Sequence, residues 1–290
     1  ELRGLNKGVE PVWRLPSVTK LELRGIDCDW FPALLAPAVT ELGLHPYSYP
    51  VLVQLLLQLP KLQKLRCVSS DMDQDPVLCT DSCDRLVAAI GQGAWPDMQH
   101  FWLFKHPLPV TFCTALTHWR LLTTLSVDLY SPIDLSYLRA MMQQLPALTR
   151  LEELSARGVQ CYRNYARGPN PPRLESKPEA NADDAVVPAL RQLHLDFARD
   201  EFFSGLRFPA LAQLGLGAAD VVIDDLGGVL LRMPKLLILS NYTYSWKSMC
   251  TIRAPGVDAV LPSLQEVSFR QCQAVDDRDV LALVAAAPAL

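Results

Sequence analysis

The sequence lacks any apolar run long enough to cross a lipid bilayer. Its longest apolar stretch, Val280–Leu290, has 11 residues and contains Pro288. A membrane-spanning helix needs about 20 predominantly apolar residues. We therefore predict that no segment of the chain spans a membrane.

Cysteine and net charge are also sparse. Eight cysteines are spread over 290 residues without the spacing of a disulfide framework, which favours reduced thiols and an intracellular, cytoplasmic location. The formal net charge is only −4, with 27 basic and 31 acidic residues. Binding to nucleic acid requires clustered Lys and Arg side chains, so nucleic acid is not the expected partner.

Motifs that mark catalysis are missing as well. The sequence contains no nucleophile elbow, no glycine-rich phosphate-binding loop and no pair of histidines spaced to hold a metal ion on a helix. These patterns carry the nucleophile, the phosphate cradle and the metal in many enzymes. The protein is therefore not expected to be an enzyme.

Two stretches carry side chains that can ligate metals, but neither has a suitable pattern. The acidic series at 71–75 begins like a calcium loop, yet Pro76 stands where that loop requires Gly. Cys79 and Cys83 are spaced like a zinc-binding pair, but the next histidine, His100, falls on a predicted strand. We predict no metal site and no cofactor.

What the sequence does contain is one short phrase repeated along its length. The phrase is an apolar residue followed by Pro, a second apolar residue two positions later, and then an apolar–x–apolar pair. It reads Leu15–Leu23 in one copy and Ala36–Leu44 in the next. Successive copies begin 21 to 28 residues apart, except for two longer steps of 36 and 42 residues. A self-similar step of this length is typical of a solenoid of stacked repeats.

Each copy predicts one strand followed by one helix. The apolar–x–apolar pair has the period of a strand. Between the pairs, apolar residues recur at helical spacing, as over 51–59, 135–145 and 226–233, and Asp224 is a candidate helix N-cap. Alternating strands and helices favour a parallel sheet with helices on one face. The predicted strand centres are Leu21, Leu42, Leu65, Phe101, Leu125, Leu154, Leu193, Leu214, Leu239 and Val267.

The phrase resembles that of the leucine-rich-repeat family, Leu-x-x-Leu-x-Leu-x-x-Asn/Cys, and the resemblance covers the whole chain. It implies an α/β fold: a leucine-rich-repeat solenoid with a curved parallel sheet on the concave face and helices on the convex face. The ninth position departs from the family, because residues such as Ile26, Tyr47 and His106 replace the usual Asn. The backbone groups that this Asn would bind therefore need other partners. The last full repeat, Leu264–Cys272, is similar to the cysteine-containing subtype, which is frequent in F-box proteins, the substrate receptors of ubiquitin ligases.

We expect residues 1–290 to form a single array of about ten full repeats. The start, Glu1–Leu5, recurs one repeat later, and Ala287–Leu290 opens a further phrase, so both ends are expected to be cut within a repeat. The two long steps mark insertions at 69–84 and 162–187. The second is rich in proline and charge and is expected to be poorly ordered or extended. Such insertions often contact partners.

The expected binding surface is the concave face of the sheet, made of the side chains that flank each strand centre. Strand 100–104 is unusual because it places Trp102 and Phe104 on this solvated face, where they leave apolar area exposed. Trp and Arg are frequent anchors of protein interfaces. We predict that a protein partner, or one of the insertions, covers these rings. The predicted protein-binding residues are Trp102, Phe104, His100, Lys64, Arg66 and Asp128.

These features favour a non-enzymatic protein–protein interaction module or a scaffold subunit of a larger protein or assembly. The resemblance also implies two more specific alternatives. One is the substrate-recognition part of an F-box ubiquitin ligase, and the other is the sensor domain of an intracellular nucleotide-binding leucine-rich-repeat immune receptor. An F-box or a nucleotide-binding domain upstream of Glu1 would distinguish the two.

Overall fold

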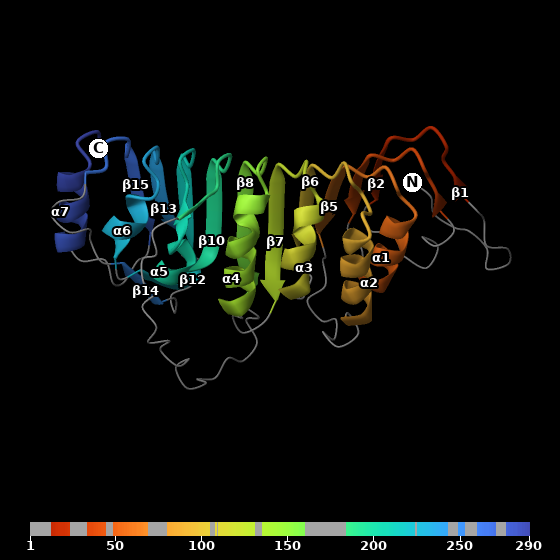
Figure 1. Ribbon diagram of the computed structural model, residues 1–290, viewed down its shortest axis with the longest axis horizontal. Helices are drawn as coiled ribbons and strands as arrows, with labels where there is room; N and C mark the ends of the chain where they lie inside the picture. Colours follow the sequence, from red (N-terminus) through yellow and green to blue (C-terminus); the bar gives the residue numbers. More distant parts are fainter. Residues whose placement is uncertain are drawn as a thin grey trace.

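The molecule is an α/β array in which strands and helices alternate along one axis (Figure 1). No helix in the part of the chain described by the structure is long and apolar enough to cross a membrane. The computed structural model describes residues 13–23, 34–44, 49–68, 80–104, 108, 110–130, 135–159, 184–223, 225–242, 249–252, 260–270 and 277–290.

One sheet of 11 strands runs through the molecule, and every pair of strands in it is parallel. Ten strands are hydrogen-bonded in the order in which they occur in the sequence, while β14 (Met249–Ile252) pairs with the far end of β12. The ten strands are β2 (Lys20–Leu23), β4 (Glu41–Leu44), β5 (Lys64–Val68), β6 (His100–Phe104), β7 (Thr124–Tyr130), β8 (Glu153–Val159), β10 (Gln192–Arg199), β12 (Gln213–Ile223), β13 (Ile238–Tyr242) and β15 (Glu266–Arg270).

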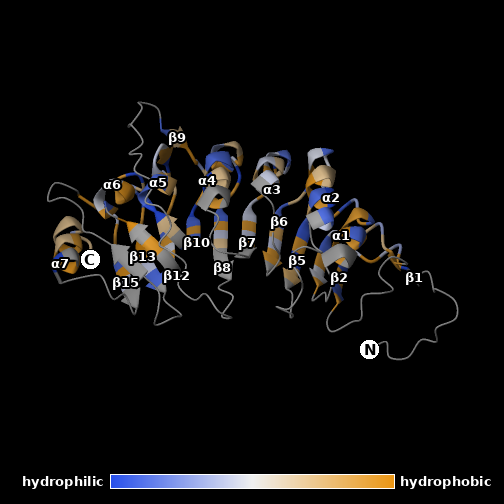
Figure 2. Ribbon diagram, turned by 90° about the horizontal axis from the view of Figure 1, so that it is seen from below, coloured by the Kyte–Doolittle hydropathy of each residue, from blue (hydrophilic) through white to orange (hydrophobic). Residues whose placement is uncertain are grey.

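Helices α1 to α6 lie on one face of the sheet and leave the other face open (Figure 2). We call this second face the open face; it carries the residues that flank the strand centres, such as Arg66 and Trp102. The helical periodicity of the sequence matches these elements, because Leu138, Met141 and Met142 of α4 are buried together. The helices are α1 (Tyr49–Leu57), α2 (Thr80–Gly91), α3 (Val110–Ala115), α4 (Leu135–Gln144), α5 (Asp200–Phe203), α6 (Leu226–Leu230) and α7 (Asp277–Ala286).

The predicted strand centres lie side by side across the sheet, which confirms the predicted parallel pairing. Leu21 pairs with Leu42, and the row continues strand by strand to Leu239 and Val267. Eight of these ten residues are at most 2% exposed. Leu21 and Val267 are only partly buried, because each lies on an outermost strand of the sheet and has a neighbouring strand on one side alone.

A repeated hydrogen-bond pattern fixes the entrance to each strand. The carbonyl of Thr19 accepts hydrogen bonds from the N–H groups of both Thr40 and Glu41, at 2.8 and 3.0 Å. The same arrangement recurs at each following strand up to β15, where the carbonyl of Leu237 accepts two such bonds. Each shared carbonyl satisfies two backbone donors at the entrance of the next strand. The ninth-position residues Ile26, Tyr47 and His106 lie outside the described residues.

Large aromatic side chains fill the core beneath β6. The ring centroid of Phe101 lies 5.5 Å from that of Phe112 and 5.0 Å from that of Trp119. Trp95 lies beside this cluster, and its indole N–H donates to two carbonyl groups at the C-terminal end of α1, at 3.2 and 3.0 Å. Because these contacts join residues of successive repeats, the cluster ties the helical layer to the sheet.

Both predicted insertions end earlier than expected. Residues 80–84 form the start of α2 rather than part of a loop over 69–84, because Cys83 begins a buried face at helical spacing. Residues 185–186 of the insertion predicted at 162–187 form β9 (Ala185–Val186), which pairs with β11 (Leu206–Arg207) outside the large sheet. A similar small pair joins β1 (Trp13–Arg14) to β3 (Leu34–Leu35). The rest of both insertions, and the predicted strand at Leu2–Leu5, lie outside the described residues.

The N-cap of α6 is Asp225, one residue after the predicted Asp224. Its carboxylate accepts a hydrogen bond from the backbone N–H of Gly228 at 2.9 Å. A Cβ atom at position 228 would collide with this carboxylate. Gly228 therefore makes room for the cap inside its own repeat.

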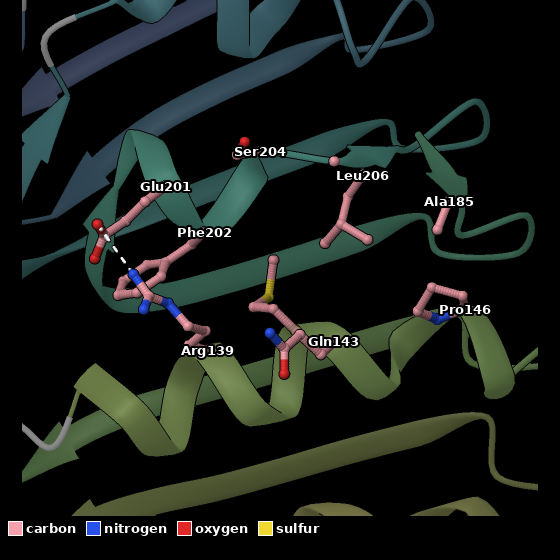
Figure 3. Close-up of a pocket in the computed structure, with 10 residues that line it drawn as sticks. Arg139, Gln143, Pro146, Ala185, Glu201, Phe202, Ser204 and Leu206 are labelled. Atoms are coloured by element: carbon pink, nitrogen blue, oxygen red, sulfur yellow. Dashed lines mark ion pairs between the residues drawn. The ribbon is translucent and has the colours of Figure 1, made fainter. Parts of the chain in front are cut away.

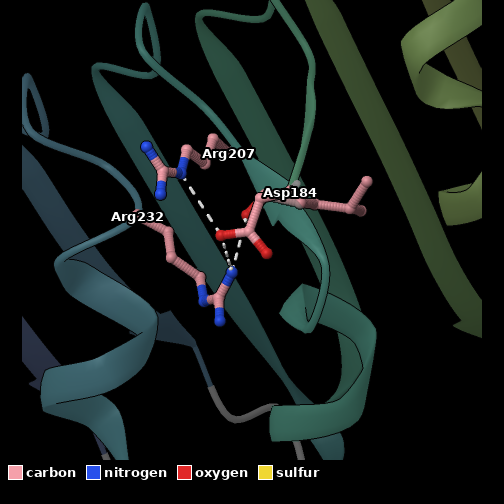
Figure 4. Close-up of polar contacts among 4 residues, drawn as sticks. Asp184, Arg207 and Arg232 are labelled. Carbon is pink, nitrogen blue, oxygen red and sulfur yellow. Dashed lines mark hydrogen bonds and ion pairs between the residues drawn. The ribbon is translucent and has the colours of Figure 1, made fainter. Parts of the chain in front are cut away.

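Asp184 anchors the chain just after residues 160–183. Its Oδ2 accepts hydrogen bonds from Nε of Arg207 at 3.2 Å and from Nη1 of Arg232 at 2.6 Å (Figure 4). Arg232 also donates to the carbonyl of Leu206 at 3.3 Å. The two guanidinium groups hold the pKa of Asp184 below its usual range, chiefly through the hydrogen bond from Arg232. We call this cluster the Asp184 clasp.

Replacing Asp184 with Asn is expected to lower the free energy of unfolding by about 1 kcal/mol at neutral pH. Because folding lowers the pKa of this carboxyl, its contribution is present above the unfolded-state pKa and is lost as the pH falls through the folded-state value. The difference between wild type and Asp184→Asn should therefore shrink below about pH 4. Urea denaturation at pH 7 and at lower pH measures it, with exposed Asp97→Asn as the control. A difference that stays constant with pH would contradict the clasp.

Candidate functional site

Four of the six predicted binding residues lie together on two neighbouring strands of the open face. Lys64 of β5 pairs in register with His100 of β6, and Arg66 pairs in register with Trp102. The alternation of side chains along a strand directs all four away from the helical layer. The register of β5 and β6 therefore brings these four residues together on one face of the sheet.

These strands border an open hollow of about 530 Å³ that extends from β2 to β10. We call it the open-face groove. Its lining includes Lys64, Arg66, His100, Trp102, Ser126, Ser155 and Glu153.

Trp102 is half-buried, and Arg66 provides part of its cover. The guanidinium carbon of Arg66 lies 4.3 Å from the centroid of the indole ring, a distance typical of a cation–π contact. The indole N–H is buried and has no hydrogen-bond acceptor among the described residues. The sequence analysis considered a partner or an insertion as the cover of this ring, and the structure adds a third source, the side chain of the neighbouring strand.

Two lysines share one carboxylate at the N-terminal end of the groove, which leaves this group of three side chains with one net positive charge. Glu41 accepts a hydrogen bond from Nζ of Lys64 at 2.8 Å, and its other oxygen lies 3.7 Å from Nζ of Lys20. The hydrogen bond from Lys64 is the main cause that keeps the pKa of Glu41 below its usual range. Because these groups are accessible to solvent, they define local charge more than they stabilise the fold.

His100 lies half-buried between the charged end of the groove and Trp102. Burial lowers the pKa of its imidazole, and the nearby charge of Lys64 lowers it further. The carboxylates of Glu153 and Glu41 act in the opposite direction but do not overcome these causes. His100 is therefore mainly neutral at pH 7 and adds no positive charge to the groove.

Beyond Trp102 the floor of the groove consists of small side chains. Ser126 and Ser155 follow Trp102 in register and are 8% and 3% exposed. His194 of β10 comes next, and its imidazole fills the place that a Cβ atom would take at Gly215. The expectation that residues flanking the strand centres stay exposed is wrong for these serines, because much larger side chains stand on either side of them.

The side chains of the remaining two predicted residues, Phe104 and Asp128, lie outside the described residues, although their backbones belong to β6 and β7. Sequence reasoning missed Glu41 and Glu153 as parts of the site. Both occupy the outward position before a strand centre, the same position as the predicted Lys64. Reading charge across neighbouring repeats is the signal that identifies them.

A second hollow, of about 420 Å³, lies on the helical side between α4 and α5 (Figure 3). Arg139 of α4 and Glu201 of α5 form an ion pair of 3.1 Å at its edge. Among the described residues, the connection from β8 to β10 contains no helix, so α4 and α5 become neighbours across this gap. None of the sequence-predicted binding residues lies here.

The fold and the open-face groove define the class of the molecule: an α/β repeat protein built on one long parallel sheet. No family model matches the sequence, and the comparison with curated proteins found no match. One solved structure to which the chain is loosely similar is that of the Rad7 and Elc1 complex in yeast, whose matching chain has 14% sequence identity and a TM-score of 0.45. The match covers 94% of this chain and 60% of that chain. So loose a likeness carries no argument about function.

Proposed function

We propose that this protein is a non-enzymatic leucine-rich-repeat interaction module that binds a protein partner through the open-face groove. The observation that carries the proposal is the stacked pair of Arg66 and Trp102, 4.3 Å apart, on the lining of the groove. Arg and Trp are strongly enriched among the residues that dominate the binding energy of protein interfaces. Here both belong to one solvent-accessible hollow.

The sheet supports this pair before any partner arrives. β5 and β6 are hydrogen-bonded along their whole length, and Phe101, between His100 and Trp102 in the sequence, is 1% exposed in the core below. A side chain whose backbone is already fixed loses less conformational freedom on binding. A partner that covers Trp102 also removes from water the apolar area that Arg66 leaves accessible.

The resemblance to leucine-rich repeats extends the proposal to an intracellular scaffold subunit, with two more specific versions. The similarity of Leu264–Cys272 to the cysteine-containing repeat supports the substrate-recognition part of an F-box ubiquitin ligase. The other version is the sensor domain of an intracellular nucleotide-binding leucine-rich-repeat immune receptor, in which the same sheet would bind the recognised protein. In each version the open-face groove holds the partner and performs no chemistry.

Photo-crosslinking from the groove tests the proposal. Benzoylphenylalanine at Thr124, which lines the groove, is expected to attach to a partner protein in a lysate of the source cells. The same residue at Thr114, exposed on α3, should not form that product. Adding Arg66→Ala to the Thr124 variant should lower the yield about tenfold, the equivalent of about 1.4 kcal/mol. Equal products from both positions, or none from Thr124, would contradict binding through the groove.

A further inference from the structure

The guanidinium of Arg66 is held in place while its hydrogen-bond donors stay available. It stacks on the ring of Trp102 at 4.3 Å, and this is the one ring or polar contact that Arg66 makes among the described residues. The residue is nevertheless exposed. A guanidinium carries its five N–H donors around the edge of a rigid plane. Stacking therefore occupies one face of the plane and leaves its edge accessible to a ligand.

The surroundings of Arg66 on β5 carry a net positive charge. Lys64 lies two residues before Arg66, so both side chains are on the same face of the sheet. Lys64 shares the carboxylate of Glu41 with Lys20, and these three side chains sum to one positive charge. Arg66 raises the sum to two, and Glu22 on β2, two strands from Arg66, lowers it to one. This end of the open-face groove therefore favours a negatively charged ligand.

The carboxylate on the other side of the groove is too distant to cancel this charge. Glu153 belongs to β8, three strands from β5, which corresponds to about 14 Å between backbones. The screening length at physiological ionic strength is about 8 Å. Between β5 and β8 the groove contains His100, which is mainly neutral because burial lowers its pKa. A ligand above β5 therefore experiences mainly the charges of Lys64 and Arg66.

We propose that this end of the open-face groove binds an acidic segment of the protein partner, in which one Asp or Glu side chain forms a two-point ion pair with Arg66. This inference rests on the proposed function and specifies the chemistry of the partner. The planes of a guanidinium and a carboxylate match, and the pair forms two parallel charge-assisted hydrogen bonds. Stacking on Trp102 restrains the guanidinium beforehand, so less conformational freedom is lost on binding. A neighbouring carboxylate of the segment pairs with the exposed Lys64.

A protein carboxylate fits this surface better than nucleic acid does. A nucleic-acid strand carries one negative charge per nucleotide and is held by a track of Lys and Arg side chains. Among the described residues, three basic side chains line the groove, and Glu22, Glu41 and Glu153 line the same hollow. Such a surface attracts one or two carboxylates but repels an extended phosphate backbone.

A titration with a short acidic peptide tests the proposal. The probe is acetyl-Gly-Asp-Glu-Asp-Gly-amide, added at low salt to the full ¹⁵N-labelled chain, while the backbone amide signals of β5 are followed by NMR. These signals are expected to shift and saturate. Arg66→Gln should raise the Kd at least about fivefold, and Arg66→Lys at least about twofold, because lysine keeps the charge but loses the planar edge. Arg85→Gln, on the exposed surface of α2, should leave the Kd unchanged.

The carboxylate of Glu41 provides a test with the opposite sign. Glu41→Gln releases Lys64 and Lys20 from their shared partner and adds one positive charge. The Kd for the acidic peptide should therefore fall about twofold or more. Glu266→Gln removes a carboxylate at the corresponding position of β15, outside the groove, and should have no effect. A Kd that Glu41→Gln raises or leaves unchanged would overturn the proposal.

A peptide with Asn and Gln in place of Asp and Glu separates charge from shape and should produce no saturable shift. Equal affinity for this peptide, or equal affinity of Arg66→Gln, would overturn the proposal. Tighter binding of single-stranded oligothymidylate than of the acidic peptide would assign the surface to nucleic acid and overturn it as well. Crosslinking from Thr124 without binding of the acidic peptide would reject the acidic segment and retain the interaction module. Binding of the peptide without a crosslinked partner would support the acidic segment and count against that module.

Discussion

Replacing Phe101 with alanine is expected to lower the free energy of unfolding by about 4 kcal/mol. The side chain is 1% exposed and packs between Phe112 and Trp119, with ring centroids 5.5 and 5.0 Å away. Its removal opens a cavity that the neighbouring rings cannot fill, because Trp119 is held by a hydrogen bond from its indole N–H to the carbonyl of Ala94 at 3.2 Å. Urea denaturation followed by circular dichroism measures the change.

Leu281→Ala is the matched control for the loss of a large apolar side chain. Leu281 lies on α7 and is 66% exposed, so its truncation should change the free energy of unfolding by about 0.5 kcal/mol at most. If Phe101→Ala destabilises the protein no more than Leu281→Ala does, Phe101 does not occupy the centre of the core. The comparison therefore tests the register of β6, which directs Phe101 inward and Trp102 outward.

Replacing Trp102 with alanine is expected to weaken binding of the crosslinked partner by about 2 kcal/mol, or roughly 30-fold in Kd. The substitution removes the half-buried ring on which Arg66 stacks at 4.3 Å, so an interface that uses both loses two contacts at once. The sheet should remain folded, because the buried strand centres are unchanged. Isothermal titration calorimetry measures the affinity, and thermal unfolding measures the stability of the variant.

Glu266→Ala is the control for a change on the open face far from the groove. Glu266 is an exposed residue of β15, at the C-terminal end of the sheet, and its replacement should leave both affinity and stability unchanged. If Trp102→Ala lowers the melting temperature but leaves the affinity unchanged, Trp102 packs the array and binds nothing. Unchanged values for both measurements would remove Trp102 from the site.

The strand centres show what could be predicted of the fold from the sequence. Nine of the ten copies of the phrase place the apolar strand centre five positions after the Pro or its equivalent, so Leu65, Phe101 and Leu125 could be aligned before any contact was known. The alternation of a strand then determines which side chains share a face. The ends of the two insertions were misplaced because the first turn of α2 and the short strand β9 carry no copy of the phrase.

The binding surface was predicted only in part. The position of a residue in the repeat identifies the face of the sheet on which its side chain lies, but not whether neighbouring side chains bury it. Trp102 and Arg66 stood out as large side chains in outward positions. Ser126 and Ser155 did not stand out, since a serine on a solvated strand is ordinary. Their burial became visible only in the folded sheet, where the larger side chains of Trp102 and His194 stand on either side of them.

The sequence by itself determined the repeating strand–helix unit, the inward row of strand centres and the outward position of the predicted binding residues. These are consequences of local periodicity, which acts over a few residues. Only the tertiary structure decided which outward side chains meet. Arg66 stacks on Trp102 of the next repeat, and Asp184 binds Arg207 and Arg232, 23 and 48 residues away in the sequence. Such contacts depend on the size and direction of neighbouring side chains across the sheet, and these are set only when the repeats pack together.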